Sequence, residues 1–256
     1  METETISKNE ACPKSQMSRG NFLKVCFAAL TVILSLTFMA CSSDEDKGAQ
    51  VSKSEAKQEF DQSNYGIYRG VFVGSSGVVA VNLGNNGNSP FAILIIDGVT
   101  LNFTTTQTVT QGSNTTILFK QGNNSFVFSV NANGTNPTVT DINIAGHPNA
   151  QMIIAKETSS VVAECYEGAY AGPYSSGTFN AIICGNKIMG LAYGSNYYAP
   201  YVCDGNLNGN SISGIVLFDV IIFNGVKGNE TISGTWTHPE ETGTWSGTQK
   251  YITTYR

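Results

Sequence analysis

The stretch Thr231–Gly247 is TISGTWTHPEETGTWSG and contains a Gly-Thr-Trp unit twice, at Gly234–Trp236 and at Gly243–Trp245. Thr and Trp favour extended strands, and glycine disfavours a helix. The Pro-Glu-Glu-Thr segment between the two units is typical of a turn. The stretch therefore predicts a β-hairpin whose glycines let the strands bend sharply, as they do in a small barrel or sandwich.

The rest of residues 61–256 has the same character, with 25 Gly and 22 Asn against only 7 Leu. Short apolar runs alternate with Gly, Asn and Pro, and no run has sustained helical periodicity. The expected fold class is all-β and antiparallel. We expect strands at residues 91–97, 99–106, 115–121, 125–131, 177–183, 188–193, 197–203, 211–224, 231–237 and 244–251.

An internal repeat divides this part of the chain. Tyr65–Gly70 is echoed by Glu167–Gly172, and Asp141–Pro148 is echoed by Thr231–Pro239. The repeat predicts two related β-barrel or sandwich units, at residues 61–160 and 161–256. The two histidines, His147 and His238, occupy related places and each precedes a proline. They are better explained as strand ends than as bases or metal ligands.

The N-terminal region has the features of an export signal. Val25–Ala40 is an apolar run of 16 residues that follows Arg19 and Lys24. At ~1.5 Å per residue a helix of this length spans about 24 Å, which is short for a bilayer core and typical of a secretory signal peptide. We expect residues 1–40 to be this signal, with Met17 as the true start, and residues 42–60 to be a flexible tether. The alternative is a membrane anchor helix.

Phe38-Met39-Ala40-Cys41 resembles the lipobox of bacterial lipoproteins, in which the cysteine is acylated after cleavage. The acid-rich tract Ser42–Asp46 resembles the export signal of surface-exposed lipoproteins of the Bacteroidetes type. These resemblances imply lipidation of Cys41 and a location in the outer membrane, facing outward. The Gly-x-Trp strand starts resemble small lipoprotein β-barrels called calycin-like, in which aromatic side chains plug the barrel.

Charge and cysteine content narrow the remaining options. The formal net charge is −5, which argues against a nucleic-acid partner. Beyond Cys41 the chain has Cys165, Cys184 and Cys203, and no spacing typical of a zinc site. In an oxidising compartment three cysteines allow at most one intramolecular disulfide. Cys184 and Cys203 each end an apolar run and are the candidate pair, with buried thiols as the alternative.

The candidate ligand-binding residues are aromatic. Four tyrosines, Tyr193, Tyr197, Tyr198 and Tyr201, lie within nine residues around an expected turn. Their flat apolar faces and hydroxyl edges suit stacking on sugar rings or gripping extended peptides. We add Trp236 and Trp245 to this set. The alternative is that alternate side chains fill the core.

The leading hypothesis is non-catalytic binding of a glycan, or of an envelope or host protein, at the cell surface. A structural or adhesion subunit is the first alternative, and it would associate through exposed sheet edges. A glycan hydrolase is the second and would need two converging carboxylates. The candidates for such a pair are Asp204, Asp219, Glu230, Glu240 and Glu241. No enzymatic activity, metal or cofactor is expected.

Overall fold

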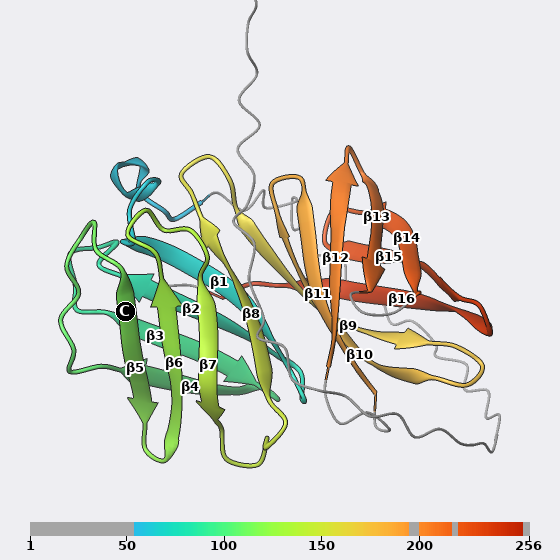
Figure 1. Ribbon diagram of the computed structural model, residues 1–256, viewed down its shortest axis with the longest axis horizontal. Helices are drawn as coiled ribbons and strands as arrows, with labels where there is room; N and C mark the ends of the chain where they lie inside the picture. Colours follow the sequence, from blue (N-terminus) through green and yellow to red (C-terminus); the bar gives the residue numbers. More distant parts are fainter. Residues whose placement is uncertain (1–53, 195–199, 217–219, 253–256) are drawn as a thin grey trace, which may run out of the picture.

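A computed structural model describes residues 54–194, 200–216 and 220–252. Two eight-stranded antiparallel units lie side by side, and the only helical turn in the described chain is η1 (Gln58–Phe60) (Figure 1). No helix among these residues is long and apolar enough to cross a membrane. The expected all-β, antiparallel fold class is confirmed.

The first unit is an antiparallel meander in which the last strand returns to the first. The order is β7-β6-β5-β4-β3-β2-β1-β8, and β4 and β5 share only the pair Thr104 and Lys120. The strands are β1 (Gly66–Val73), β2 (Gly77–Leu83), β3 (Phe91–Ile96), β4 (Val99–Thr104), β5 (Thr115–Gln121), β6 (Asn124–Val130), β7 (Thr138–Asn143) and β8 (Gln151–Glu157).

Strands β1 and β2 of the first unit are buried along their whole length, because both of their faces are covered. One face points into the unit, where Tyr68 and Phe72 pack among the phenylalanines of β4, β5 and β6. The other face, with Val71 and Val78, packs against the second unit. This double burial explains why these strands are almost continuously apolar.

The second unit is a closed barrel in which β16 pairs with β9. Closure removes the free sheet edges that the adhesion hypothesis requires in this half of the chain. The strands are β9 (Ala163–Ala171), β10 (Ser176–Cys184), β11 (Lys187–Gly194), β12 (Tyr201–Asn208), β13 (Ser211–Val216), β14 (Ile222–Lys227), β15 (Thr231–His238) and β16 (Glu241–Lys250).

Glycines that face each other across neighbouring strands make the barrel interior narrow enough to fill with rings. Gly225 lies opposite Gly234, and a Cβ on Gly225 would approach the Trp245 ring to 2.5 Å. The same pairing recurs at every second strand interface, at Gly177/Gly194, Gly205/Gly214 and Gly168/Gly247. Aromatic side chains therefore plug the barrel and lie over glycines, as the calycin-like resemblance implies.

Most of the expected strands are present, but the bounds of two strands and of the tether differ from those expected. The expected strand 211–224 is two strands, β13 and β14, and residues 217–219 between them lie outside the described residues. Residues 197–199 of the strand expected at 197–203 lie outside the described residues, and the described strand, β12, runs from Tyr201 on to Asn208. The tether expected to end at residue 60 ends earlier, because Ser54 and Glu55 already bond to Glu157 of the first unit. Residues 158–162 connect β8 to β9, where the sequence predicts the boundary between the units.

Candidate binding cleft between the two units

The two units meet through an apolar seam. Outward-facing residues of β1, β2, β3 and β8 pack against outward-facing residues of β9, β10 and β11. Polar contacts fix the register across it: Asn180, which is fully buried, donates from Nδ2 to the Phe72 carbonyl at 2.6 Å. The Cys165 thiol donates to the Gly70 carbonyl at 3.4 Å. The seam therefore holds the units as one body.

An ion cluster closes one part of this seam. Arg69 donates from Nε to Glu157 at 2.6 Å and from Nη2 to Glu55 at 3.0 Å. Its Nη1 donates to the Ile252 carbonyl. The cluster thus joins the first described residues of the chain to the last ones, across both units.

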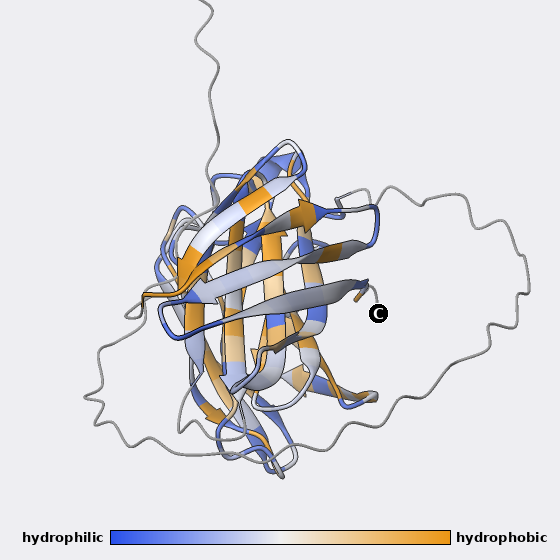
Figure 2. Ribbon diagram, turned by 90° about the vertical axis from the view of Figure 1, so that its right-hand side faces the viewer, coloured by the Kyte–Doolittle hydropathy of each residue, from blue (hydrophilic) through white to orange (hydrophobic). Residues whose placement is uncertain are grey.

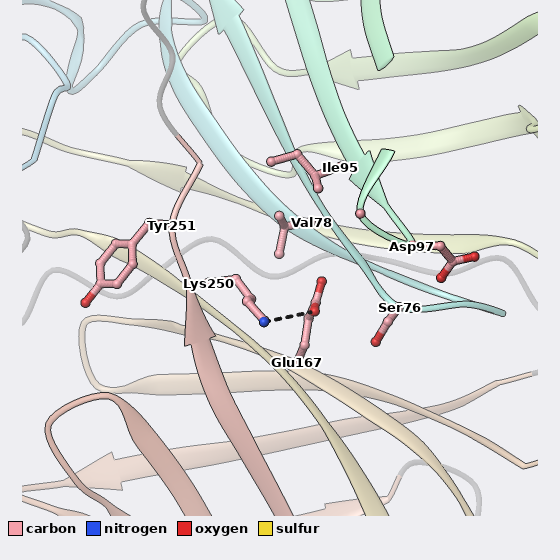
Figure 3. Close-up of a pocket in the computed structure, with 8 residues that line it drawn as sticks. Ser76, Val78, Ile95, Asp97, Glu167, Lys250 and Tyr251 are labelled. Atoms are coloured by element: carbon pink, nitrogen blue, oxygen red, sulfur yellow. Dashed lines mark ion pairs between the residues drawn. The ribbon is translucent and has the colours of Figure 1, made fainter. Parts of the chain in front are cut away.

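A cleft of about 200 Å³ opens elsewhere along the seam (Figure 3). The apolar part of its lining comes from Val78 and Ile95, which lie opposite each other on β2 and β3. The second unit contributes Glu167 from β9 and Lys250 from β16, followed by Tyr251. The rest of the lining is Ser76, Asp97 and Gly98 of the first unit.

Glu167 and Lys250 form a loose ion pair in the cleft. Their Oε2 and Nζ atoms are 3.8 Å apart, and the Glu167 side chain is 18% exposed against 48% for Lys250. Burial raises the pKa of Glu167, Lys250 lowers it, and the Asp97 carboxylate of the other unit raises it again. The net pKa is above the ordinary value for a glutamate, so a group that donates hydrogen bonds to this carboxylate would be favourable here.

Asp97 lies at the turn between β3 and β4, where it has a φ of 48° and precedes Gly98. Its carboxylate accepts a hydrogen bond from Ser75 Oγ at 2.5 Å, and its other oxygen is 3.8 Å from His147 Nε2. The serine hydroxyl thus bonds to the carboxylate and not to the imidazole. This is not the arrangement of a nucleophile activated by a histidine base.

The geometry suits recognition of a small group. The volume is below the 300–1,000 Å³ or so of a typical small-molecule site. It fits one side chain of a protein partner or one sugar ring, with Val78 and Ile95 for apolar contact and Asp97, Glu167 and Lys250 for polar contact. Among the described residues, no group of three or more His, Cys, Asp or Glu side chains could hold a metal ion.

Two solved structures share remote similarity with the chain. One is a mutant of the vaccine antigen transferrin-binding protein B from Actinobacillus pleuropneumoniae H49, with 9% identity and a TM-score of 0.28 over 59% of this chain and 81% of that chain. The other is a surface lipoprotein, also with 9% identity and a TM-score of 0.28, over 72% of this chain and 98% of that chain. No protein-family model and no curated protein matches the chain. At this level neither similarity indicates a shared ligand.

The predicted aromatic site is not assembled in the described part of the chain. Tyr193 points out of the barrel into the seam, where its hydroxyl accepts a hydrogen bond from Asn149 at 3.2 Å. Tyr201 packs against the barrel interior, on the opposite side of the sheet. Tyr197 and Tyr198 lie outside the described residues.

The two tryptophans fill the barrel core and do not present a surface to a ligand. Trp236 and Trp245 are 6% and 4% exposed and belong to the interior cluster. Trp245 donates from Nε1 to the Thr235 carbonyl at 3.1 Å. The candidate binding role for these two residues is therefore corrected: the alternation of the strands places them inward.

The candidate disulfide is not formed. Cys184 and Cys203 lie on strands separated by β11 and on opposite faces of the barrel wall. Two strands that flank a third strand lie about 9–10 Å apart. This separation exceeds the ~7 Å limit between the Cα atoms of two cysteines that form a disulfide. Cys184 instead donates from Sγ to the Lys156 carbonyl at 3.5 Å.

Glu230, Glu240, Glu241 and Asp204, the described candidates for a catalytic pair, do not line the cleft. Glu241 accepts hydrogen bonds from Ser175 Oγ at 2.8 Å and from the Tyr174 amide at 3.0 Å, so it ties down the β9–β10 connection. Glu230 contacts the Tyr251 hydroxyl at 3.4 Å. Asp204 lies on β12 and Glu240 in the β15–β16 turn, whereas Asp219 lies outside the described residues.

Sequence reasoning missed the residues that line the cleft. The Asp97-Gly98 pair is a recognisable hairpin turn, but nothing local indicates that it faces Glu167, which is 70 positions further along the chain. The signal that could have found them is the repeat itself. Glu167 begins the segment that echoes Tyr65–Gly70, and two related units are expected to pack through related strands.

Proposed function

We propose that the protein is a non-catalytic binding lipoprotein, held at the outer surface of the outer membrane by acylated Cys41. The observation that carries the proposal is the cleft between the units, which has apolar and charged sides and is lined from both units. Binding sites preferentially lie at such junctions between compact units.

The anchoring part of the proposal rests on the sequence. The chain has the sequence features expected of an exported lipoprotein: the apolar run Val25–Ala40, the following Cys41 and the acidic tract Ser42–Asp46. Between Cys41 and Ser54 the chain spans at most about 45 Å if fully extended. The cleft would therefore be held within reach of ligands arriving from outside the cell.

The ligand class is a protein side chain or a sugar unit presented by a larger molecule. A 200 Å³ cleft admits only one such group, so the rest of the partner would lie over the rims of the two units. A protein partner supplies this readily, because protein interfaces concentrate affinity in a few anchor side chains that fill pockets.

The test is a binding screen on intact cells. Surface labelling of cells that carry the wild type or Cys41→Ala first checks the anchor: labelling lost from cells and protein released in the variant supports it. The same cells are then exposed to glycan and extracellular-protein panels. Ser76→Arg fills the cleft and should abolish binding, whereas Ser113→Arg, on an exposed loop of the first unit, should leave it unchanged. A ligand that binds both variants equally would reject the cleft as its site.

A further inference from the structure

The cleft between the two units contains two carboxylates that are only loosely paired with cationic groups. Glu167 Oε2 lies 3.8 Å from Lys250 Nζ, and Asp97 Oδ2 lies 3.8 Å from His147 Nε2. The other oxygen of Asp97 accepts a hydrogen bond from Ser75 Oγ at 2.5 Å. Charge-assisted hydrogen bonds from a cation to a carboxylate are about 2.7–2.9 Å long. Both carboxylates therefore keep the capacity to accept bonds from a further cationic donor.

Glu164, on the same strand as Glu167, shows how a closely paired carboxylate differs. Its side chain is 19% exposed, against 18% for Glu167, but its Oε2 lies 2.7 Å from Lys227 Nζ. The Tyr166 hydroxyl also donates to it at 2.5 Å. Glu167 is equally withdrawn from water, yet its counter-ion is farther away. The loose pairing in the cleft is therefore a property of this site and not of the strand.

The apolar part of the cleft suits the stem of a long cationic side chain. Val78 is 2% exposed and lies deep in the cleft, and Ile95, directly opposite it on β3, is half-buried. Figure 3 shows the Glu167 side chain between Lys250 on one side and Asp97 on the other. Arginine and lysine lay their methylene stems along such apolar surface and keep the charged head group among polar groups.

We propose that the cleft takes an arginine side chain of a protein partner. This inference rests on the proposed binding function and names the group that fills the site. A guanidinium has five donors in a planar fork, so it can give two parallel hydrogen bonds to the Glu167 carboxylate and keep donors for Asp97. The lining holds two carboxylates and one ammonium group, and the whole chain has a net charge of −5. The field at the cleft therefore favours a cation.

A neutral occupant is disfavoured because a partner that covers the cleft removes water from both carboxylates. Burial of a charge without close pairing is costly. Lys250 can pair closely with only one of the two groups, and Asp97, which is 53% exposed, would also be desolvated. A guanidinium from the partner compensates the charge that Lys250 leaves unpaired.

The surroundings of the cleft give a partner little apolar area to hold. Figure 2 faces the second unit and shows its nearest strands largely in pale colours and the turns between them largely in blue. The large apolar side chains exposed on this unit lie mainly on β13 and β14, with Ile215, Ile222 and Val226, and not on β9 or β16. A polar anchor in the cleft then supplies much of the affinity, and arginine is among the residues most enriched as such anchors.

The test is a titration of the full chain in detergent with a matched pair of small probes. Nα-acetyl-arginine methylamide carries the proposed group, and Nα-acetyl-citrulline methylamide has nearly the same shape without the charge. Calorimetry at pH 8 should give a dissociation constant that is at least about tenfold lower for the arginine probe. Equal affinities, tighter binding of the citrulline probe or binding of neither probe would overturn the proposal.

Two variants should move the affinity for the arginine probe in opposite directions. Glu167→Gln removes the main acceptor and should weaken binding about tenfold. Glu240→Gln is the matched control, because Glu240 is exposed and does not line the cleft, and it should leave the affinity unchanged. Lys250→Met removes the competing cation and should strengthen binding. Equal effects of the two glutamine variants, or weaker binding by Lys250→Met, would overturn the proposal.

Failure of this inference can be told apart from failure of the proposed function. Suppose that Ser76→Arg abolishes binding of the ligand found on cells, but the arginine probe binds no better than the citrulline probe. The cleft is then the binding site and its occupant is not an arginine. A cell-surface ligand that still binds to Ser76→Arg rejects the cleft itself as its site.

Discussion

Arg69 and Glu157 form a buried ion pair at the seam between the two units, with Nε and Oε2 at 2.6 Å. Burial alone would lower the pKa of Arg69, but the Glu157 and Glu55 carboxylates raise it above its ordinary value. The same Glu157 carboxylate accepts bonds from Ser54 Oγ and from the Glu55 amide. One pair therefore holds the entering chain, the first unit and the end of the second unit together.

Replacing only one partner of this ion pair should strongly lower the free energy of unfolding. Arg69→Met leaves the Glu157 carboxylate buried without its counter-ion, and we expect it to lower the free energy of unfolding by about 3–5 kcal/mol. The double variant Arg69→Met/Glu157→Leu removes both charges and should lose less than Arg69→Met alone. Equilibrium unfolding in urea measures both. Glu157→Leu alone completes the cycle: if its loss and that of Arg69→Met simply add in the double variant, the two residues are not coupled.

The two tryptophans offer an internally controlled comparison. Both are buried in the barrel core, but Trp245 donates to the Thr235 carbonyl, whereas Trp236 Nε1 is buried and has no hydrogen-bond partner among the described residues. Trp245→Phe loses that bond, and Trp236→Phe removes an unsatisfied donor. We expect Trp245→Phe to cost about 1–2 kcal/mol more in urea unfolding than Trp236→Phe. A larger loss for Trp236→Phe would show that its indole nitrogen is satisfied in solution.

Strand composition predicted the fold class, but it could not predict which face of each strand points inward. The alternation around Trp236 and Trp245 is equally compatible with an exposed aromatic surface and with a plugged barrel. What decides it is closure: once β16 pairs with β9, the glycine-bearing face becomes the narrow interior. The cleft was beyond sequence reasoning for a similar reason, since Asp97 and Glu167 approach only through the packing of two units.

Lys156 should give the protein a pH-dependent stability in the alkaline range. It is buried, donates to the Phe60 carbonyl at 2.6 Å and to the Ser63 carbonyl, and burial lowers its pKa from 10.5 to about 8. Between pH 8 and 10.5 the unfolded state binds the additional proton, so the contribution of Lys156 to stability rises with pH across this window and is lost as pH falls through 8.

The comparison that isolates this effect is wild type against Lys156→Met at pH 7.5, 9 and 10.5. Wild type should gain stability relative to the variant at each step, because the folded amine loses its proton at a lower pH than the unfolded one. The neutral amine still has protons for both carbonyl bonds. A difference in unfolding free energy that is constant over this range would show that Lys156 stays charged when folded.

Cys203 should change stability in the opposite direction, so that stability falls as the pH rises. Labelling of the cysteines also tests the absence of a disulfide. Burial raises the pKa of Cys203 from 9.0 to about 12. The folded thiol therefore stays protonated where the unfolded one ionises, and its contribution to stability, complete below pH 9, is lost between pH 9 and 12 at up to about 1.4 kcal/mol per pH unit. The wild type should lose stability relative to Cys203→Ala over that window. In the cleaved and acylated form that we propose, a thiol reagent at pH 8 should label none of Cys165, Cys184 and Cys203 before unfolding in urea and all three afterwards. Only one labelled thiol per unfolded chain would mean that a disulfide forms after all.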